Sequence, residues 1–169
     1  MGEFLNCIHA QKNWYIDPNS ENRKHLDKDI EFYSTSAERL TMINTESIDS
    51  VFVSNFFEHL PDKKSMDLVL NEIHRVLKPD NKFLILQPNI SFAYDLYWDF
   101  YDHHTTISNR SKSEALQKNK FQVKIMILRF VTFSTKSALP KNPFFVKIYL
   151  KIQILWRFLG KQFFVLAVK

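Results

Sequence analysis

The chain has 169 residues, of which 45% are hydrophobic and 24% are charged, so it can build one ordinary globular domain and is not disordered throughout. Its single cysteine, Cys7, excludes a disulfide scaffold and a zinc site made of cysteines. The net charge of +5 is mildly basic, which is compatible with an anionic ligand or surface, and 2 glycines leave little material for a glycine-rich loop.

Short strands separated by turns are predicted in the first third of the chain. Residues 14–16 read as a strand followed by turn residues, and residues 30–33 alternate like a second strand. Between them, residues 22–29 are polar and fit one or two helical turns. A near-continuous apolar run within residues 47–54 is typical of a strand that is buried on both faces.

The clearest predicted helix spans residues 62–78. Its apolar residues recur at helical spacing, at Met66, Val69, Leu70, Ile73, Val76 and Leu77. Pro79 should end this helix, and Asp80 with Asn81 should form a tight turn that tolerates left-handed backbone. Residues 82–87 then predict another buried strand.

A capping box predicts the start of the next helix. Ser111 is expected at the N-cap and Glu114 at the third helical position, where each side chain satisfies a backbone N–H of the other residue. This helix should run to about Lys118, with Asn119 as a left-handed cap.

Two strands and one helix are predicted in the last third. Residues 121–133 read as a long strand, residues 144–159 as an amphipathic helix, and residues 162–168 as a final strand. Strands that alternate with helices predict an α/β domain with a mostly parallel sheet, in which the last two strands form an antiparallel edge pair. We therefore expect one domain over residues 1–169, with residues 139–160 as a helical insertion between the last two strands.

Three predicted strands are followed by residues that suggest a ligand site, because parallel sheets bind ligands at the carboxyl ends of their strands. Asp17 follows the first strand, and its carboxylate suits a ribose diol, although in isolation the residues at 17–19 favour a simple turn. Ser36 and Ala37 follow the second strand, in a loop that suits an adenine or is merely solvated. Asn55 directly follows the apolar run of the third strand.

Taken together, several stretches of the chain resemble class I S-adenosylmethionine-dependent methyltransferases. The resemblance rests on YIDPN, STSAERL, SIDSVFVSNFFEHL and LNEIHRVLKPDNKFLIL, and it continues through PNI, YWDFYDHHTTIS and GKQFFVLAVK. It implies a three-layer sandwich with a Rossmann-like sheet, S-adenosylmethionine as cofactor, and methyl transfer as the activity. Carried over residue by residue, it implies that Asp17 binds the ribose, that Ser36 and Ala37 flank the adenine, and that Asn55 lies beside the methionine part.

The front of the chain departs from the family pattern. Met1 to Leu5 look like the last glycine of a G-x-G-x-G turn and the start of the first helix, so Gly2 is expected to contact the cofactor. The first, central strand is missing from the sequence; in the family it lies between the strands at residues 14–16 and 47–54. Each large apolar side chain that it would bury is worth about 1.5–3 kcal/mol. We therefore expect an N-terminally truncated methyltransferase, with inactivity as one consequence and a non-catalytic remnant that binds a membrane surface or a partner as the alternative.

The acid–base candidates are histidines. His59 lies in the loop where cofactor and acceptor are expected to meet, and His104 lies in the YDHHTTIS stretch, so both are predicted as catalytic residues. His103 and His104 are adjacent, and neighbours in sequence point apart in regular structure, so we expect no metal site.

The partners are less defined. The acceptor class is not encoded in these motifs; small-molecule, lipid, sugar and protein acceptors all occur on this fold. The basic residues are dispersed, so nucleic acid is not expected as a partner. The helix at 144–159 places Lys147, Lys151 and Arg157 among aliphatic residues, which fits either contact with a membrane surface or a cover for the sheet with its charges in water.

Two further expectations complete the sequence-based picture. The aromatic stretch at 92–101 either lines a substrate pocket or packs as core. No targeting segment is recognised at the N-terminus, so a cytoplasmic location is expected.

Overall fold

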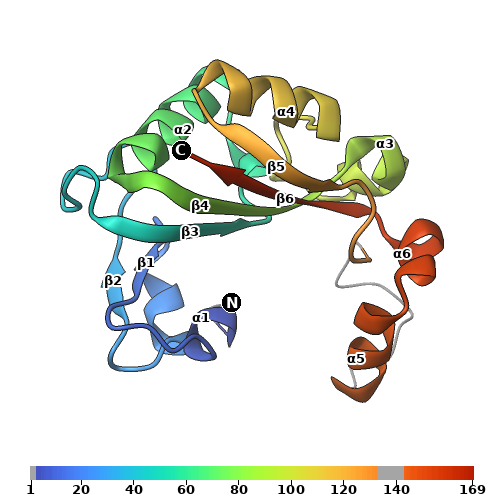
Figure 1. Ribbon diagram of the computed structural model, residues 1–169, viewed down its shortest axis with the longest axis horizontal. Helices are drawn as coiled ribbons and strands as arrows, with labels where there is room; N and C mark the ends of the chain where they lie inside the picture. Colours follow the sequence, from blue (N-terminus) through green and yellow to red (C-terminus); the bar gives the residue numbers. More distant parts are fainter. Residues whose placement is uncertain (1–2, 133–142) are drawn as a thin grey trace. The chain divides into compact units, whose positions relative to one another are not determined.

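A computed structural model describes residues 3–132 and 143–169 of the chain. The chain divides into two compact units, residues 1–44 and residues 45–169 (Figure 1). Its strands form two separate sheets, one in each unit.

The first unit is built on two short parallel strands. It contains α1 (Glu3–Asn6), β1 (Trp14–Ile16), the 3₁₀ helix η1 (Ser20–His25) and β2 (Glu31–Tyr33). Across the strand pair, the Trp14 indole donates a hydrogen bond to the Glu31 carboxylate at 2.8 Å, and the rings of Tyr15 and Phe32 stack. The two predicted strands are thus confirmed, and the polar segment between them forms one short helix that begins at Ser20.

The second unit carries a four-stranded sheet in the order β3-β4-β6-β5. Its strands are β3 (Ile48–Ser54), β4 (Leu77–Pro88), β5 (Gln122–Ile127) and β6 (Gln162–Val168). β3 and β4 are parallel, whereas β6 is antiparallel to both β4 and β5. The predicted α/β class and the antiparallel pair of C-terminal strands are therefore confirmed.

Two helices cover one face of this sheet, α2 (Lys63–Val76) and α4 (Asn109–Lys118) (Figure 1). The buried side chains on that side come from both helices and from alternate strand positions: Met66, Val69, Leu70, Ile73, Leu116, Phe83, Ile85, Phe163, Val165 and Ala167. Side chains on the other face are less enclosed, and Phe52 of β3 is exposed. The expectation that β3 is buried on both faces was wrong, because β3 is an edge strand of its sheet and these helices cover only one face.

The predicted helix 62–78 is confirmed as α2. Asp62 is its N-cap and accepts a hydrogen bond from the Ser65 N–H at 2.8 Å. The helix ends at Val76, and the chain passes directly into β4, which is longer than the predicted strand. Asp80 adopts the expected left-handed conformation, with φ of 59°.

The predicted N-cap of α4 was wrong by one turn, whereas the predicted end at Lys118 and the cap at Asn119 are confirmed. The N-cap is Ser108, and Ser111 stands at the third helical position, where its hydroxyl accepts from the Ser108 N–H. Both serines can fill the cap role, and the chain uses the earlier one. At the other end, Asn119 is not left-handed; Lys120 is, with φ of 66°, while the Asn119 amide donates to Asp67.

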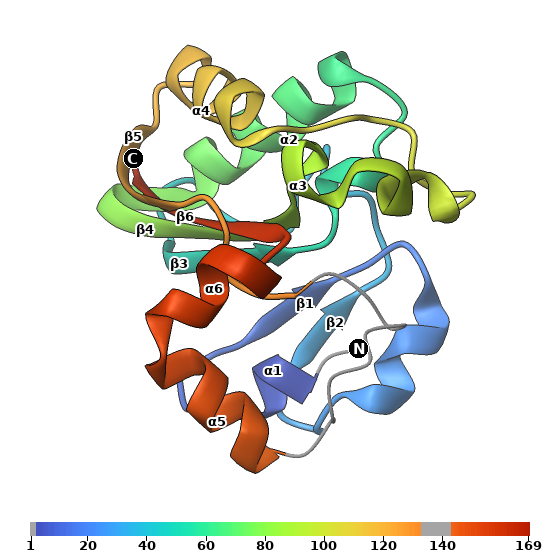
Figure 2. The ribbon, with the colours of Figure 1, turned by 90° about the vertical axis from the view of Figure 1, so that its right-hand side faces the viewer.

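The connection between β5 and β6 also differs from its prediction. β5 ends at Ile127, so the prediction of a strand over residues 128–132 was wrong, and residue 133 lies outside the described residues. The single predicted helix is two helices, α5 (Pro143–Lys151) and α6 (Gln153–Leu159), separated at Ile152 (Figure 2). The break allows the Trp156 indole to donate to the carbonyl of Tyr149 at 2.9 Å.

No helix within the described ranges has both the length and the apolar composition that crossing a bilayer requires.

Candidate active site

Asp17 stands at the carboxyl end of β1, as predicted, and its carboxylate is held in a fixed orientation. One oxygen, Oδ1, accepts from the Asn19 N–H at 2.8 Å. The other, Oδ2, accepts from the Asn22 amide at 2.8 Å and from the Tyr15 hydroxyl at 3.3 Å. A carboxylate offers about four acceptor positions. At least one position therefore remains for a ligand hydroxyl while the loop stays intact, so the residue fits the ribose role.

Ser36 and Ala37 lie in the loop that follows β2. The Ser36 hydroxyl accepts from the Glu38 N–H at 3.2 Å, which fixes a tight turn in this loop. Ser36 is exposed and Ala37 is half-buried. Gly2, the remaining predicted cofactor residue, lies outside the described residues.

Asn55 stands at the carboxyl end of β3, in the second unit. Its backbone is left-handed, with φ of 47°, a conformation that asparagine adopts more readily than most residues. The Asn55 N–H donates to the carbonyl of Leu86 at 3.0 Å, which ties the turn to the end of β4. The exposed Asn55 side chain thus starts the loop that leads to Glu58 and His59.

The loop after β3 is joined to a segment more than forty residues later in the chain. The carbonyl of Glu58 accepts from the N–H groups of His104 and Thr105, at 2.8 and 3.1 Å. The Thr105 hydroxyl donates to the carbonyl of Leu60 at 2.6 Å, and the Tyr97 hydroxyl donates to the carbonyl of Thr105. Two of the sequence motifs, EHL and DHHTT, therefore meet at the carboxyl end of β3.

His59 forms a pair with Asp102 across this junction. Its Nδ1 lies 3.2 Å from Asp102 Oδ2 and 3.1 Å from the Asp102 carbonyl oxygen. When Nδ1 carries the proton that these oxygens accept, Nε2 is the basic nitrogen. The His59 side chain is 38% exposed, so an acceptor molecule can reach it.

His103 is buried and His104 is exposed, in agreement with the expectation that neighbouring side chains point apart. His103 is buried against His59, Tyr97 and Phe100, with ring centroids 4.8 to 5.1 Å apart, and burial lowers the pKa of its imidazole. The side chain of His104 is exposed. The structure therefore brings His59 together with His103, while His104 contributes its backbone N–H to the junction.

Two ionisable side chains at this junction, those of Glu58 and Lys112, are buried. Glu58 is 1% exposed, and burial raises the pKa of its carboxyl to about 7. Lys112 of α4 is fully buried, with its amine 3.1 Å from the centre of the Phe57 ring and 3.6 Å from Met66 Sδ. Burial lowers the pKa of the Lys112 amine well below its usual value, although Glu58 opposes this. Sequence reasoning missed both residues, because a charged residue in an amphipathic pattern usually faces water.

Glu58, His59 and His103 offer ligand atoms within 4.8 Å of one another, a donor set that divalent transition metals accept. However, His59 Nδ1 is already engaged by Asp102, and the Lys112 amine interacts electrostatically with Glu58. The prediction that the chain holds no metal stays a prediction.

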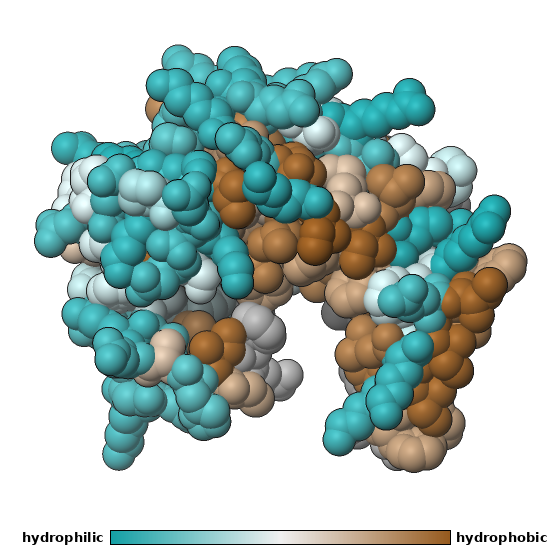
Figure 3. Space-filling model, viewed as in Figure 1, coloured by the Kyte–Doolittle hydropathy of each residue, from teal (hydrophilic) through white to brown (hydrophobic). Residues whose placement is uncertain are grey.

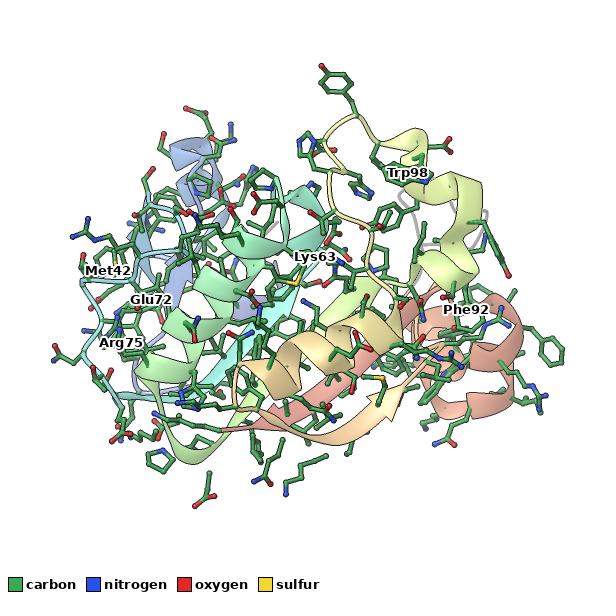
Figure 4. All side chains as sticks on the ribbon, turned by 90° about the horizontal axis from the view of Figure 1, so that it is seen from above. Met42, Lys63, Glu72, Arg75, Phe92 and Trp98 are labelled. Carbon is green, nitrogen blue, oxygen red and sulfur yellow. The ribbon has the colours of Figure 1, made fainter. Side chains whose placement is uncertain are left out.

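Part of the aromatic stretch after β4 packs as core, whereas a role in lining a substrate pocket stays a prediction. Its buried part is a small core of Ala93 and Tyr97, against which Ile90, Leu96 and Phe100 pack. Tyr94, Trp98 and Tyr101 are exposed (Trp98 is labelled in Figure 4). Phe92 lies under the Arg129 guanidinium, 4.7 Å from the ring centre (Figure 4).

Comparisons with known proteins agree with the resemblance. Residues 7–85 match a family model described as a methyltransferase domain. A curated relative, the ubiquinone/menaquinone biosynthesis C-methyltransferase of Rhodopseudomonas palustris, is 35% identical over 80 residues, which are 44% of this chain. The chain spans only 30% of that relative.

Solved structures share the fold at low sequence identity. A SAM-dependent methyltransferase from Archaeoglobus fulgidus has a TM-score of 0.67 and 16% identity, with 92% of this chain and 75% of that chain covered. A SAM-dependent methyltransferase from Thermotoga maritima, described as a possible histamine N-methyltransferase, has a TM-score of 0.68 and 16% identity, with 93% and 72% covered. The Rossmann-like methyltransferase fold predicted from the sequence is confirmed.

Proposed function

We propose that this chain is an S-adenosylmethionine-dependent methyltransferase and transfers a methyl group from S-adenosylmethionine to an acceptor. One observation carries the proposal. The family match coincides with strand ends that present Asp17, Ser36, Ala37 and Asn55, the residues to which the resemblance gives cofactor contacts. The family match and the position of these residues at strand ends thus both favour S-adenosylmethionine as the ligand.

The cofactor residues fit the chemistry expected of them. S-Adenosylmethionine supplies an electrophilic methyl group on a sulfonium centre. Asp17 has an acceptor position left on a carboxylate that Asn19 and Asn22 hold in place, which suits a ribose hydroxyl. Ser36 is exposed in the loop to which the resemblance assigns adenine, and Asn55 offers a polar side chain on a fixed turn.

His59 is the proposed general base for the acceptor. Asp102 orients its imidazole and stabilises the positive charge that the ring acquires when Nε2 takes a proton. The buried His103 packs against the ring and limits its rotation. His104, whose side chain is exposed beside this group, is kept as a second candidate.

The acceptor atom is proposed to be carbon. The curated relative that supports this choice is named a C-methyltransferase. A base at His59 can remove a proton from an activated carbon as well as from a hydroxyl. The rival prediction of a non-catalytic remnant finds no support in the comparisons, and truncation stays a prediction.

The proposal is tested by a pair of isosteric variants in the first unit. Asp17→Asn removes the negative charge at the proposed ribose contact, and Asp29→Asn removes the same charge from an exposed position without a proposed role. We expect Asp17→Asn to weaken binding of S-adenosylhomocysteine by roughly 10- to 100-fold, since a hydrogen bond to a charged group is worth about 1.5–3 kcal/mol. Asp29→Asn should bind like the unaltered chain. Equal affinities for all three proteins would refute the role of Asp17.

A further inference from the structure

The two helices between β5 and β6 expose most of their apolar side chains. Phe158 is 69% exposed, and Phe144 and Ile154 are each 63% exposed. The complete set of exposed large apolar residues here is Phe144, Phe145, Val146, Ile148, Leu150, Ile152, Ile154, Phe158 and Leu159. In Figure 3, hydrophobic surface gathers over α5 and α6 and is crossed by hydrophilic side chains. Contiguous apolar patches of this kind mark interaction sites.

The helix pair is anchored to the rest of its unit along one side. The Tyr149 hydroxyl donates to the carbonyl of Phe130 at 2.7 Å, and the Trp156 ring packs edge-on against Phe130 at 4.8 Å. Arg129 Nε donates to the carbonyl of Gly160 at 2.9 Å. A Cβ at Gly160 would lie 2.5 Å from the Trp156 carbonyl oxygen, so only glycine permits this approach. The exposed apolar residues are not among the residues that make these anchoring contacts.

All charged side chains after Glu114 are positively charged. No Asp or Glu follows Glu114 in the sequence, whereas eleven Lys and Arg residues do. On the helix pair itself Lys147, Lys151 and Arg157 are all exposed. An acidic partner is therefore attracted, and no carboxylate on these helices opposes it.

Three kinds of occupant are compatible with an apolar surface, and the charge distinguishes among them. A second copy would bring two surfaces of the same positive charge together, which is unfavourable. Nucleic acid would leave the phenylalanine and isoleucine side chains in water. The surface of an anionic bilayer accepts both components, because apolar side chains enter the boundary with the acyl chains while lysine and arginine stay at the headgroups.

We infer that α5 and α6 form a docking surface for an anionic lipid bilayer, on which the helices lie without crossing it. The exposed apolar side chains enter the interfacial layer, and Lys147, Lys151 and Arg157 contact lipid phosphates. This binding needs neither cofactor nor acceptor, so it stands or falls separately from the proposed methyl transfer.

The test is co-sedimentation of the full chain with phosphatidylcholine vesicles, with and without phosphatidylglycerol. We expect partition into the anionic vesicles at least about tenfold stronger than into the neutral ones, and weaker binding at high salt. The double variant Lys147→Gln/Lys151→Gln should weaken anionic-vesicle binding by roughly 25-fold, at about 5-fold per basic residue. Ile154→Gln/Phe158→Gln should weaken binding to both kinds of vesicle.

Control positions lie on α2, where Lys63 and Lys64 are exposed and Leu68 is 44% exposed. Lys63→Gln/Lys64→Gln and Leu68→Gln should leave partition unchanged, and circular dichroism should show native folding for every variant. Equal loss in test and control variants would overturn the inference. So would absent vesicle binding together with self-association, in sedimentation velocity, that the α5–α6 variants abolish, because the occupant would then be a second copy.

Discussion

The Glu58 carboxyl makes the stability of the fold depend on pH in a way that one substitution should remove. The side chain is 1% exposed, and its Oε2 has no hydrogen-bond partner among the described residues. Burial raises the pKa of this carboxyl from 4.5 to about 7. The folded chain therefore retains a proton that the unfolded chain loses between pH 4.5 and 7.

The sign and size of the effect follow from linkage. A raised pKa in the folded state means that the stabilising contribution is complete below pH 4.5, declines as pH rises, and is lost above about pH 7. A difference of roughly 2.5 pKa units corresponds to about 3 kcal/mol at 1.36 kcal/mol per unit. Glu58→Gln keeps the shape of the side chain but cannot ionise. We therefore expect the variant to gain about 3 kcal/mol of stability relative to the unaltered chain between pH 4.5 and pH 8.

The assay is urea unfolding at several pH values between 4.5 and 8, with the free energy of unfolding compared between the two proteins at each pH. Groups that do not interact with Glu58 titrate alike in both proteins and cancel in the difference. Glu114→Gln is the control, because Glu114 is exposed on the same α4 helix that buries Lys112. A difference for Glu58→Gln that stays constant across the pH range would refute the reasoning that burial governs this carboxyl.

Three further predictions concern packing, capping and metals. Phe83 is fully buried in the sheet, so Phe83→Ala should lower the free energy of unfolding in urea by about 3–5 kcal/mol. Ser108 is the N-cap of α4, so Ser108→Ala should cost about 1 kcal/mol in the same assay, and a negligible change would contradict the observed cap. Extensive dialysis against EDTA should leave the melting temperature unchanged, since His59 already pairs with Asp102; a fall that Zn²⁺ reverses would overturn the prediction that the chain holds no metal.

The sequence predicted those elements whose pattern is local. The helix α2 was clear because its apolar residues repeat at helical spacing and Asp62 precedes it. The strand β6 was predicted with its observed limits. Errors arose where two residues compete for one role: Ser108 and Ser111 both suit an N-cap, and only the path of the chain before α4 decides between them.

The site was predicted only in part, for a related reason. Asp17 and Asn55 could be found because a polar residue at the end of an apolar run is visible in the sequence. The pairing of His59 with Asp102, and the burial of Glu58 and Lys112, depend on contacts across more than forty residues of chain. Such contacts follow from the tertiary fold and leave no periodic signal.

The most direct test of the account is calorimetric titration of the chain with S-adenosylmethionine, after cooperative unfolding has shown that the protein is folded. The account predicts saturable binding at one site, with a Kd in the micromolar range, that S-adenosylhomocysteine competes away. A folded chain that takes up no S-adenosylmethionine would contradict the proposal that it transfers a methyl group.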